Sequence, residues 1–401
     1  MRHAHDYLRH LVDVGGSDLH LKAGGPAYVR VDGELMAVDT LPPLTPSDTE
    51  TFARQLMPVD RWDRFEAGAE ADFAYALADG TRFRAAAFSQ LGKVGLVLRR
   101  VESGGPSFDS LGLPASVRKL AEEHRGLVLV TGPTGSGKTT TTAAMIGHIN
   151  ATRRCHIVTI EDPIEIIHAD NLALVDQREI GTDTSSFATA LRSAARQDPD
   201  VILVGEMRDL ETTGAALQAA ATGHLVISTL HTTSAKDTVT RIIDLYPPDQ
   251  QGQARLSLAG SLQGIVCQRL VPRAGGGRVA ALEVMVVTSR IQEILLDPSR
   301  TGEIVDAIAE GDYYGMQTFD QHLLQLHREG RVTLKDAMEH ATSPHDFRIA
   351  ARAAGVSCAG CRRAPPGRGV NAPTSRSPST GRWSSPRPGR RRSGSSTCPR
   401  C

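Results

Sequence analysis

The sequence predicts an α/β protein in which a doubly wound parallel-sheet domain follows a smaller α+β domain. A buried strand over 128–131 runs directly into a glycine-rich turn and then a helix. Further apolar strands at 156–160, 201–204 and 224–231 alternate with helical segments, as in a parallel sheet. The first hundred residues instead show short strands joined by Asp-Gly turns. A chain of 401 residues is long enough for two or three domains.

Local signals divide residues 1–101 into helices and hairpins. A short amphipathic helix is expected over 7–14, and Thr45-Pro46-Ser47-Asp48 predicts a capping box that opens a helix reaching about Met57. Asp32-Gly33 and Asp79-Gly80 are strong hairpin signals. Strands are expected at 17–21, 27–31, 34–38, 71–77, 81–88 and 94–101.

Composition places the other boundaries. The Gly/Pro/Ser-rich stretch 102–114 is predicted to be a linker, and a flexible joint there would let two domains change their relative orientation. A second domain is expected over 115–356. Residues 357–401 are rich in Arg, Pro and Ser and are predicted to form a disordered tail.

Charge is unevenly distributed although the formal net charge is +0. Ten of the 45 basic residues are arginines beyond Val356, which leaves 35 basic against 45 acidic residues before that point. An acidic body is a poor partner for nucleic acid, so none is expected. No apolar run reaches the roughly 18 residues of a membrane span, and no apolar signal segment follows Met1. The sequence therefore predicts a cytoplasmic protein that at most docks on a membrane machine.

Six cysteines fall into two groups. Cys155 and Cys267 lie in apolar stretches and are expected to be small buried side chains. The pairs Cys358/Cys361 and Cys398/Cys401 have the spacing of zinc ligands, but no strand signal lies between them. Zinc binding, disorder and a shifted reading frame at the end of the gene all remain open for this tail.

The glycine-rich turn is the strongest functional signal. Gly132-Pro133-Thr134-Gly135-Ser136-Gly137-Lys138-Thr139 fits G-x-x-x-x-G-K-[ST]. Glycines let backbone N–H groups point inward, and the helix that follows adds its positive N-terminus. The Lys138 side chain is expected at the β- and γ-phosphates, Thr139 at Mg²⁺, and Thr140 beside them. These residues predict a site for a nucleoside triphosphate.

Two carboxylates follow later strands of the same predicted sheet. Glu161 ends the strand 156–160, and Glu206 follows the strand 201–204 after Gly205. Ligands bind at the carboxyl ends of such strands, so both are candidate active-site groups. Because Gly205 stands where a Mg²⁺-binding Asp is usual, Glu206 is better suited to orienting or deprotonating water. The alternatives are a helix-capping role for Asp162 and Glu165 and a solvated strand end for Glu206.

Two histidines and a group of arginines complete the candidates. His224 and His231 bracket one strand and would lie about 23 Å apart at roughly 3.3 Å per residue, so they cannot share one phosphate. His231 is at the carboxyl end and could sense a γ-phosphate, whereas His224 is expected at a structural or subunit contact. Basic residues on two predicted strands either form a solvated face or reach a phosphate on a neighbouring subunit: Arg82, Arg84, Arg99 and Arg100.

Four further blocks follow the glycine-rich turn in order, and together they resemble a known family. These blocks are Ile160-Glu-Asp-Pro-Ile-Glu165, Leu191-Arg through Val201-Ile202, Gly205-Glu-Met-Arg-Asp209 and Thr222-Gly-His through His231-Thr232. The chain is similar over about residues 5–356 to the secretion ATPase superfamily, most of all to its PilT-type twitching-motility ATPases. Two departures stand out: Ala195 replaces an expected leucine, and 288–310 does not reproduce the Ala-Ile-Arg retraction motif of that branch.

The resemblance implies a RecA-like ATPase domain preceded by a PAS-like domain, assembled as a ring-shaped homohexamer. It implies ATP and Mg²⁺ as cofactors, Glu206 as general base, Glu161 as a ligand for Mg²⁺ or water, and His231 as phosphate sensor. Arg82, Arg84 and Arg99 would complete the nucleotide site. The implied function is type IV pilus retraction, by a protein held at the inner face of the cytoplasmic membrane by a platform protein. A motor for pilus assembly or type II secretion is the alternative, and a nucleic-acid motor or a non-hydrolysing nucleotide switch would be more distant ones.

Overall fold

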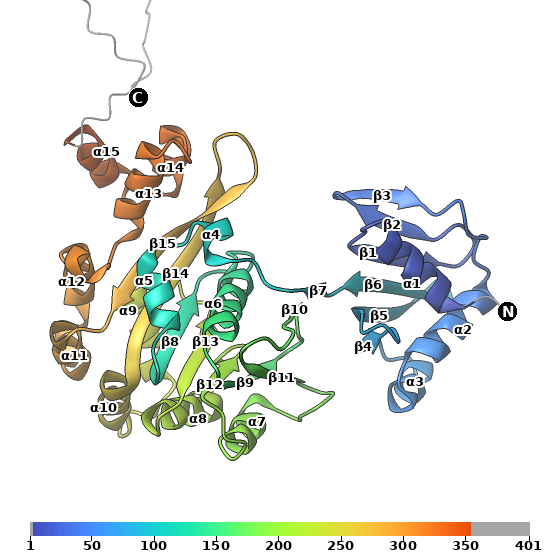
Figure 1. Ribbon diagram of the computed structural model, residues 1–401, viewed down its shortest axis with the longest axis horizontal. Coiled ribbons are helices and arrows are strands. Elements are labelled where there is room, and N and C mark those ends of the chain that lie inside the picture. Colours follow the sequence, from blue (N-terminus) through green and yellow to red (C-terminus); the bar gives the residue numbers. More distant parts are fainter. Residues whose placement is uncertain (1–2, 354–401) are drawn as a thin grey trace, which may run out of the picture. The chain divides into compact units, whose positions relative to one another are not determined.

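The computed structural model describes residues 3–353, which form an antiparallel-sheet domain followed by a parallel-sheet domain (Figure 1). The predicted disorder and cysteine pairs of the tail lie outside the described residues. Of the two described cysteines, Cys267 is buried as expected and Cys155 is half-buried. No helix within the described part of the chain is long and apolar enough to cross a membrane.

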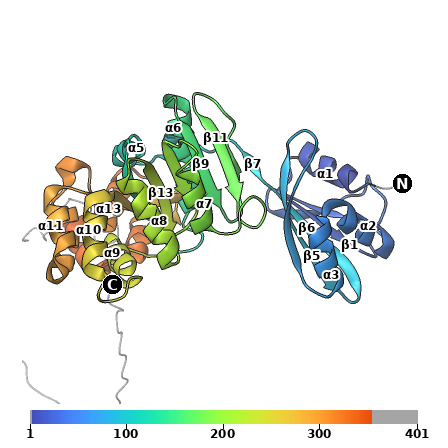
Figure 2. The same cartoon turned by 90° about the horizontal axis from the view of Figure 1, so that it is seen from below.

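The N-terminal domain is a six-stranded antiparallel sheet with helices on one face (Figure 2). Its strand order is β3-β2-β1-β6-β5-β4. Alternate residues along the strands, such as Phe83, Ala85 and Ala87, point into the core beneath the helices, as the period of two requires. The elements are α1 (Ala4–Asp13), β1 (Asp18–Lys22), β2 (Tyr28–Val31), β3 (Glu34–Ala37), α2 (Pro46–Leu56), α3 (Val59–Glu66), β4 (Ala71–Ala76), β5 (Arg82–Gln90) and β6 (Lys93–Arg100).

The local signals in this domain are confirmed. Asp32 and Gly33 both have positive φ, 50° and 87°, as a two-residue turn between β2 and β3 needs. Thr45 accepts a hydrogen bond from the Asp48 backbone while the Asp48 side chain accepts one from the Thr45 backbone, so the capping box is complete.

Replacing Thr45 with alanine should destabilise α2 by about 1 kcal/mol, because the cap satisfies a backbone N–H that the helix cannot. Hydrogen exchange of the α2 amides in the intact protein measures this. Thr45→Ser keeps the hydroxyl and is the matched control. Equal protection in both variants would show that packing alone holds the helix end.

The segment predicted to be a linker contains ordered elements. Strand β7 (Glu102–Ser103) pairs in parallel with β10 (Ile166–Ile167), and helix α4 (Phe108–Leu111) is capped by Ser107. A Gly/Pro/Ser-rich composition therefore does not make all of 102–114 irregular. The domain boundaries themselves stay predictions.

The second domain is built on a seven-stranded sheet of order β11-β9-β12-β13-β8-β14-β15. It is parallel except for the antiparallel hairpin of β14 (Leu262–Pro272) and β15 (Arg278–Val286). Leu127 and Leu129 of β8 pack with α7–α10, while Val128 and Val130 pack with α5 and α6. Both faces are thus covered, as in a doubly wound fold (Figure 1). Its first elements are α5 (Ala115–Ala121), β8 (Gly126–Thr131), α6 (Lys138–Thr152), β9 (His156–Glu161), β11 (Leu174–Glu179), α7 (Phe187–Ala194), β12 (Val201–Val204), α8 (Leu210–Ala221), β13 (Leu225–Leu230) and α9 (Ala235–Asp244).

The remaining elements extend from α10 to the end of the described residues. They are α10 (Gln251–Ser261), β14 (Leu262–Pro272), β15 (Arg278–Val286), α11 (Ser289–Leu296), η1 (Pro298–Glu303), α12 (Ile304–Ala309), η2 (Asp312–Tyr314), α13 (Phe319–Arg328), α14 (Leu334–His340) and α15 (Pro344–Ala353). The predicted helix 187–197 ends early, at Ala194, ahead of the Asp198-Pro199 turn. His224 and His231 flank the strand β13, which begins one residue after His224 and ends one residue before His231.

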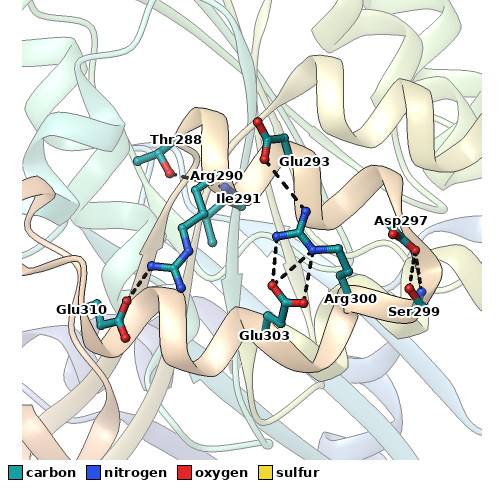
Figure 3. Close-up of polar contacts among 9 residues, drawn as sticks. All are labelled: Thr288, Arg290, Ile291, Glu293, Asp297, Ser299, Arg300, Glu303 and Glu310. Atoms are coloured by element: carbon teal, nitrogen blue, oxygen red, sulfur yellow. Dashed lines mark hydrogen bonds and ion pairs between the residues drawn. The ribbon is translucent and has the colours of Figure 1, made fainter.

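The segment that lacks the retraction motif forms α11, η1 and α12, and exposed ion pairs lie on its surface (Figure 3). Thr288 caps α11, and Arg290 pairs with Glu310 at 2.6 Å. Arg300 pairs with Glu303 at 2.9 Å and lies 3.9 Å from Glu293. Solvent-exposed pairs of this kind add little stability, so the buried side of these helices holds the segment in place.

Candidate active site

The glycine-rich turn connects the buried strand β8 to the N-terminus of α6. Gly132, Gly135 and Gly137 have φ values of 149°, 77° and 89°, which are open to glycine and strained for other residues. The Lys138 ammonium folds back over the loop and donates to the carbonyl oxygens of Gly132 and Pro133, at 2.8 and 3.2 Å. Burial lowers the pKa of Lys138, although Glu206 and Glu165 act in the opposite direction. The loop and the helix end together form an anion site.

A cavity of about 540 Å³ opens at this loop and brings most of the predicted residues together. Strands β9, β12 and β13 lie side by side, so the residues after their carboxyl ends meet at one edge of the sheet. The predicted residues that line the cavity are Thr134, Gly135, Gly137, Lys138, Thr139, Thr140, Glu161, Glu206 and His231.

Glu161 is the most buried carboxylate of this cavity, at 9% exposure. Its Oε1 accepts hydrogen bonds from the Thr159 hydroxyl at 2.7 Å and from the Gln177 amide at 3.2 Å. Burial raises its pKa, and these two bonds only partly oppose that effect. The cavity therefore contains a carboxylate whose charge is poorly solvated without a cation.

Replacing Glu161 with glutamine should change how the stability of the nucleotide-free protein depends on pH. The pKa of Glu161 is raised above the ordinary 4.5, so its contribution to folding is present below about that pH. It is lost as the pH rises through the folded-state pKa. Thermal unfolding should show Glu161→Gln gaining stability over the wild type from pH 4.5 toward neutrality.

The exposed carboxylate of Glu211 provides the matched control, because Glu211→Gln removes a charge outside the cavity. Parallel pH profiles for wild type and Glu161→Gln would contradict the burial argument. Added Mg²⁺ and ADP should reverse the order and stabilise the wild type more, if the carboxylate helps to hold the cation.

Glu206 lies between a cation and a histidine. Its Oε2 forms an ion pair with the Arg208 guanidinium, with the Arg208 Nε 2.6 Å away, and lies 3.4 Å from His231 Nε2. Gly205 precedes it at a close approach of two strands: a Cβ there would lie 3.3 Å from the Ile160 carbonyl oxygen and 3.4 Å from the Glu161 Cα. The close approach of β9 and β12 thus places two carboxylates in one cavity.

His224 lies at the opposite end of β13. Its Nδ1 is 2.9 Å from the Ala219 carbonyl oxygen and 3.3 Å from the Thr222 hydroxyl. Both partners belong to the end of α8, so the ring joins that helix to the start of the strand. This geometry fits the structural reading of His224.

The three predicted arginines do not line this cavity. Arg82 pairs with Glu179 at 3.0 Å, and Arg84 lies 3.5 Å from Glu165. Arg99 pairs with the buried Asp18 at 2.7 Å. Their predicted contact with a nucleotide on a neighbouring subunit stays a prediction.

Asp18 explains why Arg99 is held where it is. Burial alone would raise the pKa of Asp18, but the hydrogen bonds from Ser17 and Arg99 outweigh it, and the pKa is lowered. The Asp18 carboxylate is therefore charged and attracts the guanidinium on the neighbouring strand β6.

Three residues near the loop were not anticipated from the sequence. Arg208 and Arg278 line the cavity, and Gln268 of β14 contacts the glycine-rich loop from below. Arg208 could have been noticed, since it lies two residues after Glu206. Arg278 and Gln268 are more than 125 residues away from the loop in sequence, and no motif contains them.

The fold and the cavity define a P-loop nucleotide hydrolase: a doubly wound sheet with a glycine-rich loop, a strand-end carboxylate suited to activating water, and a histidine beside it. Comparison then identifies the branch. Residues 6–339 match the family described as type II/IV secretion system protein. The chain belongs to this family and is an ATPase.

Two relatives and one solved structure show how the chain compares with members of this family. The type IV pilus retraction ATPase PilT of Pseudomonas aeruginosa is 44% identical over 333 residues, which is 83% of this chain and 96% of PilT. A crystal structure of the pilus retraction motor PilT with bound ADP matches with a TM-score of 0.79, covering 87% of this chain and 100% of that one. The type II secretion system protein E of Xanthomonas campestris is 39% identical, over 55% of this chain and 38% of its own length.

Proposed function

We propose that this protein is a cytoplasmic, hexameric ATPase that drives type IV pilus retraction. The observation that supports it most is the likeness to PilT in sequence and in structure, which covers more than four fifths of this chain and nearly all of PilT. The type II secretion relative is matched over little more than a third of its length, which favours the pilus branch. The protein would act at the inner face of the cytoplasmic membrane by docking on a platform protein of the pilus machine.

In this proposal each group of the cavity has a role. The amides of the loop and the Lys138 ammonium bind the phosphates, and Glu206 orients and deprotonates the attacking water. His231 lies beside Glu206 and detects whether a terminal phosphate is present. The Ser136 hydroxyl is buried and has no hydrogen-bond partner among residues 3–353, which leaves it available to a ligand.

Mg²⁺ fits the oxygen groups at the loop. Thr139 supplies a hydroxyl, and Glu161 supplies the poorly solvated carboxylate. Within the described residues no three His, Cys, Asp or Glu side chains gather to form a metal site. This is expected of Mg²⁺ that enters with nucleotide, because it is bound by few protein groups and by phosphates. When bound, it would offset the negative charge of the phosphates.

Coupling to force would use the N-terminal domain of a neighbouring subunit. Arg82, Arg84 and Arg99 lie on β5 and β6 and are at least partly exposed, and Arg99 is the most exposed of the three, at 67% of its side chain. With ATP bound, these cations would contact the phosphates and close the joint near Gly104-Gly105. Loss of the γ-phosphate would release them, and sequential closures around a ring would move the platform protein.

A motor for pilus assembly is the second candidate, because 288–310 does not reproduce the retraction motif. A deletion strain separates the two. Loss of a retraction motor leaves cells hyperpiliated, whereas loss of an assembly motor leaves them without pili. Complementation by the wild type but not by Lys138→Ala would tie the phenotype to ATP hydrolysis.

Purified protein tests the biochemical part of the proposal. Phosphate release and native mass measured on one sample test hydrolysis and hexamer formation together. ATP turnover should not increase with added DNA, given the acidic body of the chain. An inert monomer would contradict the proposed function.

A further inference from the structure

Gln268 is a residue of strand β14 that contacts the buried side of the glycine-rich loop, and it is 3% exposed. Its Nε2 donates to the Ser136 carbonyl oxygen at 2.7 Å. Its Oε1 accepts from the hydroxyl of Thr141, also at 2.7 Å. One buried amide therefore joins the tip of the loop to the first turn of α6.

The orientation of this amide is determined by its partners. The Ser136 carbonyl oxygen can only accept a hydrogen bond, so it must face the NH₂ group of Gln268. That leaves the carbonyl oxygen of the side chain facing Thr141, whose hydroxyl can donate. Thr141 is fully buried, so the pair is shielded from water.

The loop also contacts β14 through its backbone. A Cβ on Gly132 would lie 2.4 Å from the Gln268 carbonyl oxygen, and a Cβ on Gly137 would lie 2.7 Å from its Nε2. These two glycines are thus required by close approach to Gln268 as well as by their positive φ. The loop is supported from β14 near both of its ends.

The hydrogen bond to Ser136 determines where the next amide points. In a trans peptide the C=O and the N–H point in opposite directions. Because the Ser136 carbonyl points to Gln268, the Gly137 N–H points away from β14. Gly137 lines the cavity, and amides of such loops bind the α- and β-phosphates.

We propose that Gln268 is a positioning residue for nucleotide binding: it holds the Ser136–Gly137 peptide in the orientation that presents its N–H to phosphate. The inference rests on the nucleotide-binding part of the proposed function and not on its pilus part. The α- and β-phosphates are common to ADP and ATP. Loss of this support should therefore weaken the binding of ADP and of ATP by a similar factor.

The test measures the affinity of intact protein for ADP and ATP, each with Mg²⁺, in three variants. Gln268→Leu removes both hydrogen bonds, and Gln268→Glu keeps the shape but removes the donor to Ser136. Each should raise Kd about tenfold or more, equally for ADP and ATP, with a larger change in KM than in kcat. Thr141→Val frees only the Oε1 end and should have a smaller effect in the same direction.

Gln317→Leu is the matched control. Gln317 also donates from its side chain to a backbone carbonyl, that of Leu282 at 3.1 Å, but outside the cavity. It should leave Kd within twofold of the wild type. Unfolding temperatures without nucleotide show how much each variant loses in stability alone.

Two results would overturn the inference. One is ADP affinity within twofold of the wild type in Thr141→Val and in each Gln268 variant that folds, even with a lower unfolding temperature. The other is a loss confined to ATP. If instead the loop is not the nucleotide site at all, Lys138→Ala would bind ADP as tightly as the wild type does. That result distinguishes a failure of the proposed site from a failure of the role given to Gln268.

Discussion

Glu206→Gln should lower kcat for ATP hydrolysis by about 10²-fold or more while ATP still binds. The amide keeps the shape of the side chain and can still bond to Arg208 or His231, but it cannot accept a proton from water. The loss should therefore fall on the chemical step. Steady-state phosphate release combined with ATP-binding measurements separates kcat from affinity.

Glu211→Gln is the control for this variant. Glu211 is also a carboxylate paired with an arginine, Arg192 at 2.7 Å, but its side chain lies on the exposed side of α8, outside the cavity. The Glu211→Gln variant is expected to turn over ATP within twofold of the wild-type rate. If Glu206→Gln hydrolysed ATP at the wild-type rate, another group would have to activate the water.

Lys138→Ala should abolish both nucleotide binding and turnover, with turnover falling by about 10²-fold or more. The ammonium is partly buried at the loop and held by two backbone carbonyls. Its removal takes away the cation that the loop itself supplies for phosphate binding. Equilibrium binding of ADP and ATP should show the loss for both nucleotides, in contrast to Glu206→Gln.

Lys236→Ala removes an exposed lysine from the first turn of α9 and serves as the control. It changes the net charge by the same amount without touching the cavity. Wild-type affinity in Lys138→Ala would mean that the loop amides alone bind nucleotide. The assignment of Lys138 would then be wrong.

Sequence signals were reliable where a few adjacent residues determine the conformation. Asp32-Gly33 and the Thr45 capping box formed the turn and helix start that they predict. The loop from Gly132 to Thr139 likewise lies between a strand and a helix, as its pattern requires. In each case the physical cause is local: a backbone angle that glycine permits, or an unsatisfied N–H that a side chain caps.

Elements with weak local signals were missed. Helix α3 (Val59–Glu66) is mostly polar, and its N-cap residue, Pro58, has no side chain that could cap it. No sequence signal therefore marked its start. The edge strand β11 (Leu174–Glu179) contains several charged residues and forms through pairing with β9. Such elements depend on neighbours that a single stretch of sequence does not reveal.

The site shows the same division. Glu161 and Glu206 could be found because each lies at or just after the end of a recognisable strand, and the strand order brings the two ends together. Gln268 could not be found, because its partners Ser136 and Thr141 are about 130 residues away and only the position of β14 beside β8 joins them.

The strand order also bears on how the protein is made. Strand β8, which leads into the glycine-rich loop, lies between β13 and β14, and both are translated after it. On the ribosome the loop emerges long before the strands that flank it. We therefore expect nascent chains to bind nucleotide only after Pro272, the last residue of β14, has emerged from the ribosome.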